Sequence, residues 1–161
     1  MQVLVDLEGN MEFRGLPPLF AETLFRLPEV LRDDDPAVRQ RLLPNAYEDE
    51  DDAEQWRKYA LPEIEHLYLG RIEIVEQDLT SLREIDETEF AIRIPVEHRY
   101  AWLSALNAAR LSMFITGGFT AEDMEAEVVF EGLEEDLTLL KIHYLAFMQQ
   151  MLLEAGGFDD A

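Results

Sequence analysis

Cysteine is absent from this chain of 161 residues, and its absence removes several classes of function at once. Without a thiol there is no thiol catalysis, no disulfide and no cysteine-ligated zinc. Basic residues are also scarce: 13 Lys and Arg stand against 35 Asp and Glu, which gives a net charge of −22. Because phosphate contacts need a basic surface, this balance argues against direct binding of nucleic acid or of an anionic membrane.

Long apolar runs are missing as well. The most apolar stretch carries Arg110 near its middle, and a charge there costs roughly 2.5–3.5 kcal/mol inside a bilayer. The start of the sequence, MQVLVDLEGN, lacks the basic residues and the long apolar run of a signal peptide. We therefore expect a cytoplasmic protein. The acidic excess permits a basic protein partner or mimicry of nucleic acid, and solubility alone also explains it.

Apolar residues make up 48% of the chain, which is enough to bury a sizeable core. The length fits one domain, and no linker or repeat divides the sequence, so we predict a single domain over residues 1–161 with a frayed acidic tail at 156–161. The expected fold class is mainly α. We predict a helical bundle around a central buried helix, residues 96–117, together with a small antiparallel β-sheet.

The predicted central helix follows from the pattern between Pro95 and Gly118, where apolar residues occur all round the helix. At about 100° per residue, bulky side chains fall on one side and small ones on the other. We expect the bulky side to fill the core and the small side to let another backbone come close. The bulky residues are Val96, Tyr100, Leu103, Leu106, Leu111 and Phe114, and the small ones are Ala101, Ala105, Ala108, Ala109 and Ser112.

The sheet is predicted from two segments. Residues 2–14 alternate as a hairpin with Gly9 and Asn10 in a two-residue turn, and residues 89–94 alternate as a third strand. Asp35 and Pro36 are typical of a capped helix start. The remaining helices are expected at residues 17–32 with a break at Pro28, 36–43, 53–60 before Pro62, 62–85 and 131–155.

Four polar residues on apolar helix faces form the first candidate site. Arg71 and Asp78 fall in the apolar stripe of residues 62–85, and Asn107 and Arg110 fall in that of the central helix. A buried guanidinium needs carboxylates or carbonyls, so we expect Arg110 to be buried and bonded to an acid such as Asp78. The four residues form either a buried network that fixes helix pairing or a pocket for an anionic ligand or a peptide terminus.

Motifs for metals and catalysis are sparse. Glu63 and His66 form one Glu-x-x-His pair, whereas a carboxylate-bridged dimetal site needs that pair on two helices. The acidic run at 48–54 is either a cation site or docking strip, or a solvated loop, and its spacing does not match a calcium loop. No serine lies in a nucleophile elbow and no glycine-rich phosphate loop occurs. We predict no cofactor, no metal and no enzymatic activity.

The last predicted helix, residues 131–155, has two apolar strips on opposite sides, and one of them is enough to cover the central helix. The other strip is either covered within the monomer by the hairpin or the first helix, or it meets a partner. We predict a homodimer about a two-fold axis, since symmetric dimers are the commonest soluble oligomers. The residues of this second strip are Leu139, Ile142, Ala146 and Leu153.

Several segments together resemble a known family. They are Leu42-Leu43-Pro44-Asn45-Ala46-Tyr47 before the acidic run, Trp102-Leu103-x-x-Leu106-Asn107-x-x-Arg110-Leu111, and a terminal Tyr144-x-x-Phe147 helix. Over roughly residues 15–155 the chain resembles an uncharacterised, mostly actinobacterial domain-of-unknown-function family. The resemblance implies an acidic, helical, cytoplasmic bacterial protein with no established activity. It also implies a gene often found near that of the protease adaptor ClpS, and hence a link to proteolysis.

These observations favour a non-enzymatic regulatory or scaffold protein that acts through protein–protein contacts. The alternative is a small-ligand-binding protein or an enzyme that uses carboxylates and Arg110. A third hypothesis is a mimic of nucleic acid that occupies a basic partner. A concave pocket lined by Asn107, Arg110 and two or more acids favours a ligand, whereas a filled core with an exposed apolar surface favours a protein partner.

Overall fold

The computed structural model describes residues 1–44, 46–122 and 133–155 of the chain. It is mostly helical with one four-stranded antiparallel sheet, which confirms the predicted fold class in outline. The strands are β1 (Gln2–Val5), β2 (Met11–Leu16), β3 (Arg83–Asp86) and β4 (Glu89–Ile94). The helices are α1 (Pro18–Phe25), α2 (Leu27–Leu31), α3 (Pro36–Leu42), α4 (Glu50–Gln55), α5 (Leu61–Asp78), α6 (Arg99–Thr116) and α8 (Leu133–Ala155).

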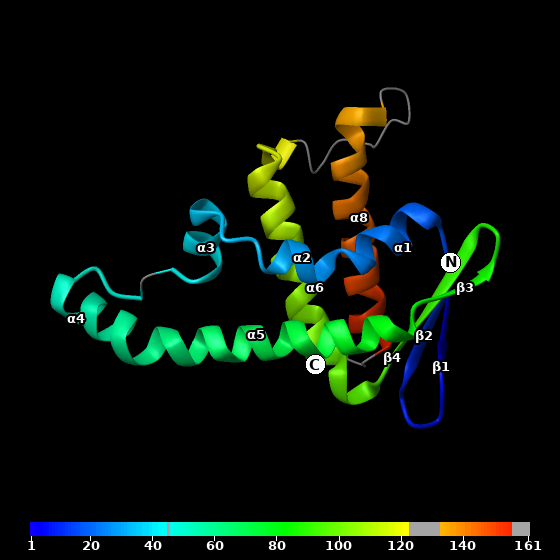
Figure 1. The fold of residues 1–161 in the computed structure, drawn as a ribbon, viewed down its shortest axis with the longest axis horizontal. Helices are drawn as coiled ribbons and strands as arrows, with labels where there is room; N and C mark the ends of the chain where they lie inside the picture. Colours follow the sequence, from blue (N-terminus) through cyan, green and yellow to red (C-terminus); the bar gives the residue numbers. More distant parts are fainter. Residues whose placement is uncertain (45, 123–132, 156–161) are drawn as a thin grey trace.

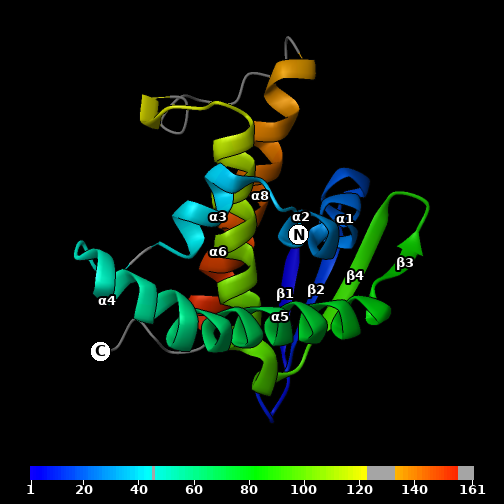
Figure 2. The ribbon, with the colours of Figure 1, turned by 60° about the vertical axis from the view of Figure 1, so that its left-hand side comes forward.

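Helices α6 and α8 pack along each other, and α5 runs across α6 (Figures 1 and 2). The sheet lies at one end of the molecule, where α1, α5 and the start of α6 meet it (Figure 1). Helix α6 also contacts α2 and α3. Short helical turns at Trp56–Ala60, Leu79–Ser81 and Val96–His98 join the longer elements.

The sheet has the strand order β1-β2-β4-β3. Residues 89–94 pair with the second strand of the N-terminal hairpin, as predicted, with Phe13 opposite Ile92 and Met11 opposite Ile94. These four residues are buried, because side chains of paired residues point to the same face and this face meets the helices. The sheet therefore supplies one wall of the core.

The hairpin turn is longer than predicted. Val5 pairs with Met11, so the loop runs from Asp6 to Asn10 and is not a two-residue turn at Gly9 and Asn10. The Asp6 carboxylate organises the loop by accepting hydrogen bonds from the backbone and the side chain of Asn10, and the side-chain bond holds the pKa of Asp6 below its usual value. Asn10 is buried, and its amide oxygen accepts from the backbone N–H of Val96, which ties the hairpin to the start of α6.

The prediction of a helix through residues 62–85 is wrong at its end. Helix α5 stops at Asp78, and residues 83–86 form the edge strand β3. The hydroxyl of Thr80 donates to the carbonyl of Gln77 at 2.6 Å, and the hydroxyl of Ser81 donates to the carbonyl of Asp78 at 2.8 Å. These side chains bond to carbonyls that the backbone N–H groups of a further helical turn would otherwise bond. All four residues of β3 are exposed, which removes the alternation that would have identified a strand.

Pro62 does not separate two helices. The chain runs from α4 through the π-helical turn Trp56–Ala60 directly into α5, where Pro62 occupies the first turn. Pro62 lacks the N–H that would bond to the turn before it, and that turn is π-helical, so the missing bond falls where the helix already departs from α geometry. The helix cap predicted at Asp35 is confirmed, since its carboxylate accepts from the backbone N–H of Ala37 at 2.9 Å.

Helix α6 buries the side that the sequence analysis assigned to close backbone approach. Its small residues Ala101, Ala105, Ala108, Ala109 and Ser112 are buried, together with Trp102 and Leu106. The predicted bulky side is more open, because Tyr100 is 69% exposed and Leu103, Leu111 and Phe114 are half-buried. The helix is therefore buried on one side and not all round, and its alanine side lets neighbouring helices approach.

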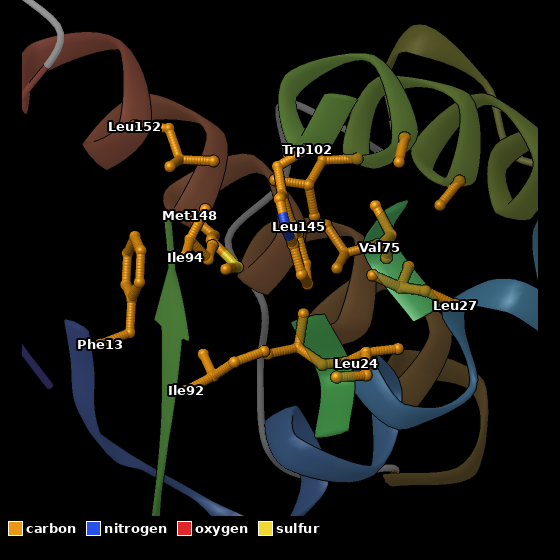
Figure 3. Packing of buried hydrophobic residues seen from close by; sticks show 14 of the residues in the cluster. Phe13, Leu24, Leu27, Val75, Ile92, Ile94, Trp102, Leu145, Met148 and Leu152 are labelled. Carbon is orange, nitrogen blue, oxygen red and sulfur yellow. The ribbon is translucent and has the colours of Figure 1, made fainter. Parts of the chain in front are cut away.

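Trp102 lies at the middle of the core, among Leu24, Leu27, Val75 and Leu145 (Figure 3). Phe13, Ile92 and Ile94 line the sheet side, where Met148 and Leu152 of α8 face them (Figure 3). The core thus draws on strands, on the short helices α1 and α2, and on α5, α6 and α8. This arrangement holds the end of α5 beside the start of α6, where a buried polar cluster lies.

Candidate functional site

Asp78, the last residue of α5, is the centre of a buried polar cluster. It is only 7% exposed, and it accepts hydrogen bonds from two residues of the α6 region. The indole N–H of Trp102 donates to its Oδ2 at 2.9 Å, and Nδ1 of His98 lies 2.9 and 2.8 Å from its two carboxylate oxygens. Both carboxylate oxygens are therefore used, and the end of α5 is bonded to the start of α6.

The Asp78–His98 pair has the geometry of an acid–base dyad, in which a carboxylate holds one imidazole nitrogen and leaves the other available. A dyad needs a third group that receives or gives the proton. The partners of the His98 ring in the described part of the chain are the two oxygens of Asp78. Within the described residues, the pair connects the end of α5 to the start of α6.

The four residues predicted as one network lie apart. Arg71 donates from Nη1 to the hydroxyl of Ser104 at 3.0 Å at the surface, and Asn107 is exposed. Arg110 donates from Nη1 to the side-chain oxygen of Gln149 on α8 at 2.7 Å, and Asp78 is bonded to other residues. No hydrogen bond joins any two of these four described residues, and Arg71, Asp78 and Arg110 each make a separate contact between helices.

Arg110 borders a shallow concavity of about 210 Å³ between α6 and α8. Its other lining residues are Asn107, Leu111, Phe114 and Ile142. The guanidinium is half-buried, and burial lowers the pKa of Arg110 because the charged form loses hydration. Acids do not line this concavity among the described residues, so the predicted mark of an acid-based active site is not found there.

Metal-ligating groups do not converge in the described part of the chain, where no three His, Asp or Glu residues gather. Glu63 and His66 both lie exposed in the first turns of α5. None of the described helices combines the length and apolar character needed to cross a bilayer.

The acidic run at 48–54 begins helix α4. The carboxylate of Asp49 caps this helix by accepting from the backbone N–H groups of Asp51 and Asp52 at 2.9 and 3.3 Å. Glu50, Asp51 and Asp52 follow in the first turn, where negative charge is favoured by the free N–H groups of the helix. Part of the run therefore has a local structural role.

We define the arm as residues 46–71, which comprise α4, the π-helical turn and the first half of α5. Its α4 end lies outside the paired helices α6 and α8 in both views (Figures 1 and 2). Ala53 is the only buried residue of the arm. Large apolar side chains are nevertheless exposed along it: Tyr47, Tyr59, Leu67 and Leu69.

The arm and the helix before it enclose a second concavity, of about 200 Å³, at the junction of α2, α3 and α5. Leu31, Val38 and Leu42 line one side of it, and Tyr68 and Leu69 of α5 line the other. Ion pairs span its rim between Arg32 and Glu76 and between Arg39 and Glu65. Leu31 and Val38 are buried at this junction, while Leu69 of the arm is exposed beside it.

The net charge of −22 leads to a prediction about salt. Repulsion among exposed acids opposes the compact state, and it is screened when the Debye length falls to about 8 Å at 0.15 M salt. The melting temperature should therefore rise between ~10 mM and ~150 mM NaCl, by about 2–4 °C for each kcal/mol of repulsion relieved. KCl at equal ionic strength should give the same shift, and an unchanged melting temperature would show that ion pairs already offset the acids.

The four residues of the strip predicted as a dimer interface differ in how far they are exposed. Ile142 is only 1% exposed in the single chain, whereas Leu139, Ala146 and Leu153 are half-buried. Ile142 lies beside Leu111 and Phe114 at the floor of the α6–α8 concavity, so helix α6 covers it. A dimer, which stays a prediction, has to use residues other than Ile142.

Sequence reasoning missed His98, Trp102 and Gln149. A signal for the first two was present, because His98 and Trp102 are four residues apart and share a helix face with a polar atom each. Nothing in the sequence separates Gln149 from the adjacent Gln150, and only the packing of α8 against α6 selects it.

A sequence model of a family described as a domain of unknown function, DUF2017, matches residues 3–156 of the chain. The match covers nearly the whole sequence, including the N-terminal hairpin. Nothing among curated proteins or solved structures matches the chain.

Proposed function

The chain belongs to the DUF2017 family, whose description assigns no function, and from its surface we propose that it is a non-enzymatic protein that binds a basic protein partner through the arm. The role is that of an acidic regulatory or scaffold protein. The observation that carries this proposal is the arm itself, which combines exposed apolar side chains with a dense acidic run.

Exposure of the arm is the first support. Tyr59 is 67% and Leu67 is 61% exposed, although a tyrosine and a leucine on a helix normally face a core or a partner. Aromatic side chains are enriched in protein interfaces because they bury a large area at a small cost in side-chain entropy. A helix that projects from the body with such residues uncovered is suited to a contact with another protein.

Charge is the second support, and it selects the kind of partner. Asp49, Glu50, Asp51 and Asp52 lie next to the exposed aromatic residues, and the whole chain carries −22. A field of that sign speeds the approach of a basic surface and opposes an acidic one. A second copy of this chain is therefore disfavoured at the arm, and the predicted homodimer would have to form elsewhere.

The enzyme hypothesis has less support. The concavity beside Arg110 brings no acids to that residue among the described lining residues, and no nucleophile in the described part of the chain is bonded to the Asp78–His98 pair. The link to proteolysis implied by the family resemblance remains a finer proposal. It would follow if the basic partner proved to be a component of a protease or its substrate.

The arm can be tested by affinity purification from the native host with the wild type and the double variant Tyr59→Ser, Leu67→Ser, followed by quantitative mass spectrometry. We expect the wild type to retain a protein with a basic surface and the variant to retain about tenfold less of it, which corresponds to about 1.4 kcal/mol of binding energy. Raising the salt from ~50 to ~300 mM should weaken the capture because the attraction is screened.

The matched control is Phe25→Ser, which removes an aromatic residue that is 69% exposed at the end of α1, outside the arm. It should retain the partner as the wild type does. Equal capture by the arm variant, or a partner that carries a net negative charge, would contradict the proposal.

A further inference from the structure

Arg110 has a neutral hydrogen-bond partner and a buried N–H group without a partner among the described residues. A guanidinium carries five N–H donors, and within the described part of the chain Arg110 donates to Oε1 of Gln149, a neutral acceptor. Its Nε is buried and has no partner among the described residues. A half-buried cation with one neutral partner is poorly compensated for the hydration it has lost.

Seven of the other ten arginines form ion pairs, whereas Arg41, Arg71 and Arg99 form none among the described residues. The pairs include Arg32 with Glu76, Arg39 with Glu65 and Arg57 with Glu50. Those pairs lie at the surface, where an ion pair is least needed. Arg110 is more buried, the chain has 35 acids, and none of those in the described part forms an ion pair with it.

The residues around Arg110 indicate what kind of ligand could bind to its guanidinium. The α6–α8 concavity has an apolar floor of Leu111, Phe114 and Ile142, and the exposed amide of Asn107 stands at its edge. Its volume of about 210 Å³ lies below the roughly 300–1,000 Å³ of pockets that enclose a small-molecule ligand. It is also open to solvent, so it suits the end of a longer molecule.

We propose that the concavity between α6 and α8 binds the free carboxyl terminus of a protein chain that ends in an aliphatic or aromatic residue. The terminal carboxylate pairs with the guanidinium of Arg110, which offers two parallel N–H donors to a planar acceptor. The last side chain lies on the half-buried Leu111 and Phe114, and Asn107 bonds to the terminal backbone. Capture of a carboxyl terminus is a recurring mode of peptide recognition.

Both parts of the ligand are required. The net charge of −22 repels any anion over long range, so a carboxylate alone gains little at this surface. An apolar end residue adds burial against the floor of the concavity. Salt separates the two effects, because it screens the distant acids more than it screens the half-buried contact at Arg110. Binding should therefore tighten as salt is raised to ~150 mM.

The probes are three acetylated tripeptides and one small acid, titrated into the 15N-labelled protein and followed by NMR. The first peptide is Ac-Gly-Ser-Leu with a free carboxyl terminus, the second is its terminal amide, and the third ends in glycine. The small acid is 4-methylpentanoate, which has the carboxylate and the leucine-like branch without a peptide. We expect a Kd of ~1 mM or tighter for the first peptide. The amide and the glycine peptide should bind at least ~10-fold more weakly, since a charge-assisted bond and the buried side chain each matter by about this factor. 4-Methylpentanoate should also bind at least ~10-fold more weakly, because it lacks the terminal backbone to which Asn107 bonds.

Two variants locate the site. Arg110→Gln should weaken binding of the first peptide at least ~10-fold. Arg71→Gln, which removes an arginine bonded to Ser104 on the neighbouring face of α6, should leave the Kd within ~2-fold. Far-UV circular dichroism checks that both variants are folded. The comparison of free acid with amide uses the wild type alone, so it decides the question even if Arg110→Gln does not fold.

Three results would overturn the proposal. The first is no saturable shift of residues around Arg110 by the first peptide at ~10 mM, well above the expected Kd. The second is equal binding of acid and amide. The third is binding of 4-methylpentanoate as tight as that of the peptide, which would assign the concavity to free apolar acids and not to a chain end. The arm plays no part in this test, so its outcome is independent of the function proposed above.

Discussion

Replacement of Trp102 by alanine should lower the free energy of unfolding by about 3–5 kcal/mol, the range for a large aromatic residue removed from a core. Trp102 is fully buried and lies between residues of α2, α5 and α8 (Figure 3). Its indole N–H also donates to Asp78, so the substitution removes packing and a hydrogen bond together. Because domains are stable by only about 5–15 kcal/mol, this loss is a large share of the total.

The measurement is urea unfolding followed by far-UV circular dichroism, since the chain has two tryptophans and the variant loses one of the fluorophores. The melting temperature should fall by roughly 6–20 °C, at about 2–4 °C for each kcal/mol. The control is Phe25→Ala, which removes an exposed aromatic residue from α1 and should change the stability by no more than ~0.5 kcal/mol. A loss below ~1.5 kcal/mol for Trp102→Ala would mean that the core refills the space.

The parts of the fold that depend on local chemistry could be predicted from the sequence. The cap at Asp35 and the break before Pro28 need only neighbouring residues, and both are found. The third strand at 89–94 could be predicted because the large apolar residues Phe90, Ile92 and Ile94 alternate along the sequence with Ala91 and Arg93. In these cases the signal and the structure lie within a few residues of each other.

The end of α5 could not be predicted in this way. Asp78 has a helical neighbourhood, and the groups that hold it, His98 and Trp102, are 20 and 24 residues further along the chain. Strand β3 is exposed throughout and is held by pairing with β4. The spacing of apolar residues indicates which face of a helix or strand is buried. It gives no signal for an element that has no buried face.

The candidate site was misread for a related reason. Arg110 and Asp78 both fall on apolar helix faces in the sequence. Because buried opposite charges were expected to pair, the two residues were predicted to bond to each other. The two residues are 32 positions apart along the chain. In the structure they lie on different helices, and each is bonded to other residues. The orientation of α6 decides this, because its alanine side faces the core and carries Trp102 towards Asp78, while Arg110 is turned towards α8.

Removal of the Asp78 side chain should have the second large effect. Asp78→Ala leaves the indole N–H of Trp102 without its acceptor inside the core and frees His98. A stranded buried donor costs about 1–3 kcal/mol, and the two bonds together predict a loss of roughly 2–4 kcal/mol, because the His98 side chain is 26% exposed and partly reaches water. The control Asp34→Ala removes an exposed acid from the loop before α3 and should stay within ~0.5 kcal/mol.

A double-mutant cycle decides whether the cluster acts as the connection between α5 and α6. Trp102→Phe keeps most of the ring volume and removes the N–H donor, so with the donor gone the loss of Asp78 should matter less. We expect an interaction energy of about 0.5–3 kcal/mol between Asp78→Ala and Trp102→Phe, the range for residues in direct contact. The same Asp78 variant combined with Phe25→Ala, which shares no partner with it, should be additive within ~0.5 kcal/mol. Additive losses in the first cycle would show that the indole N–H does not depend on Asp78, and the connection between the end of α5 and the start of α6 would then rest on His98.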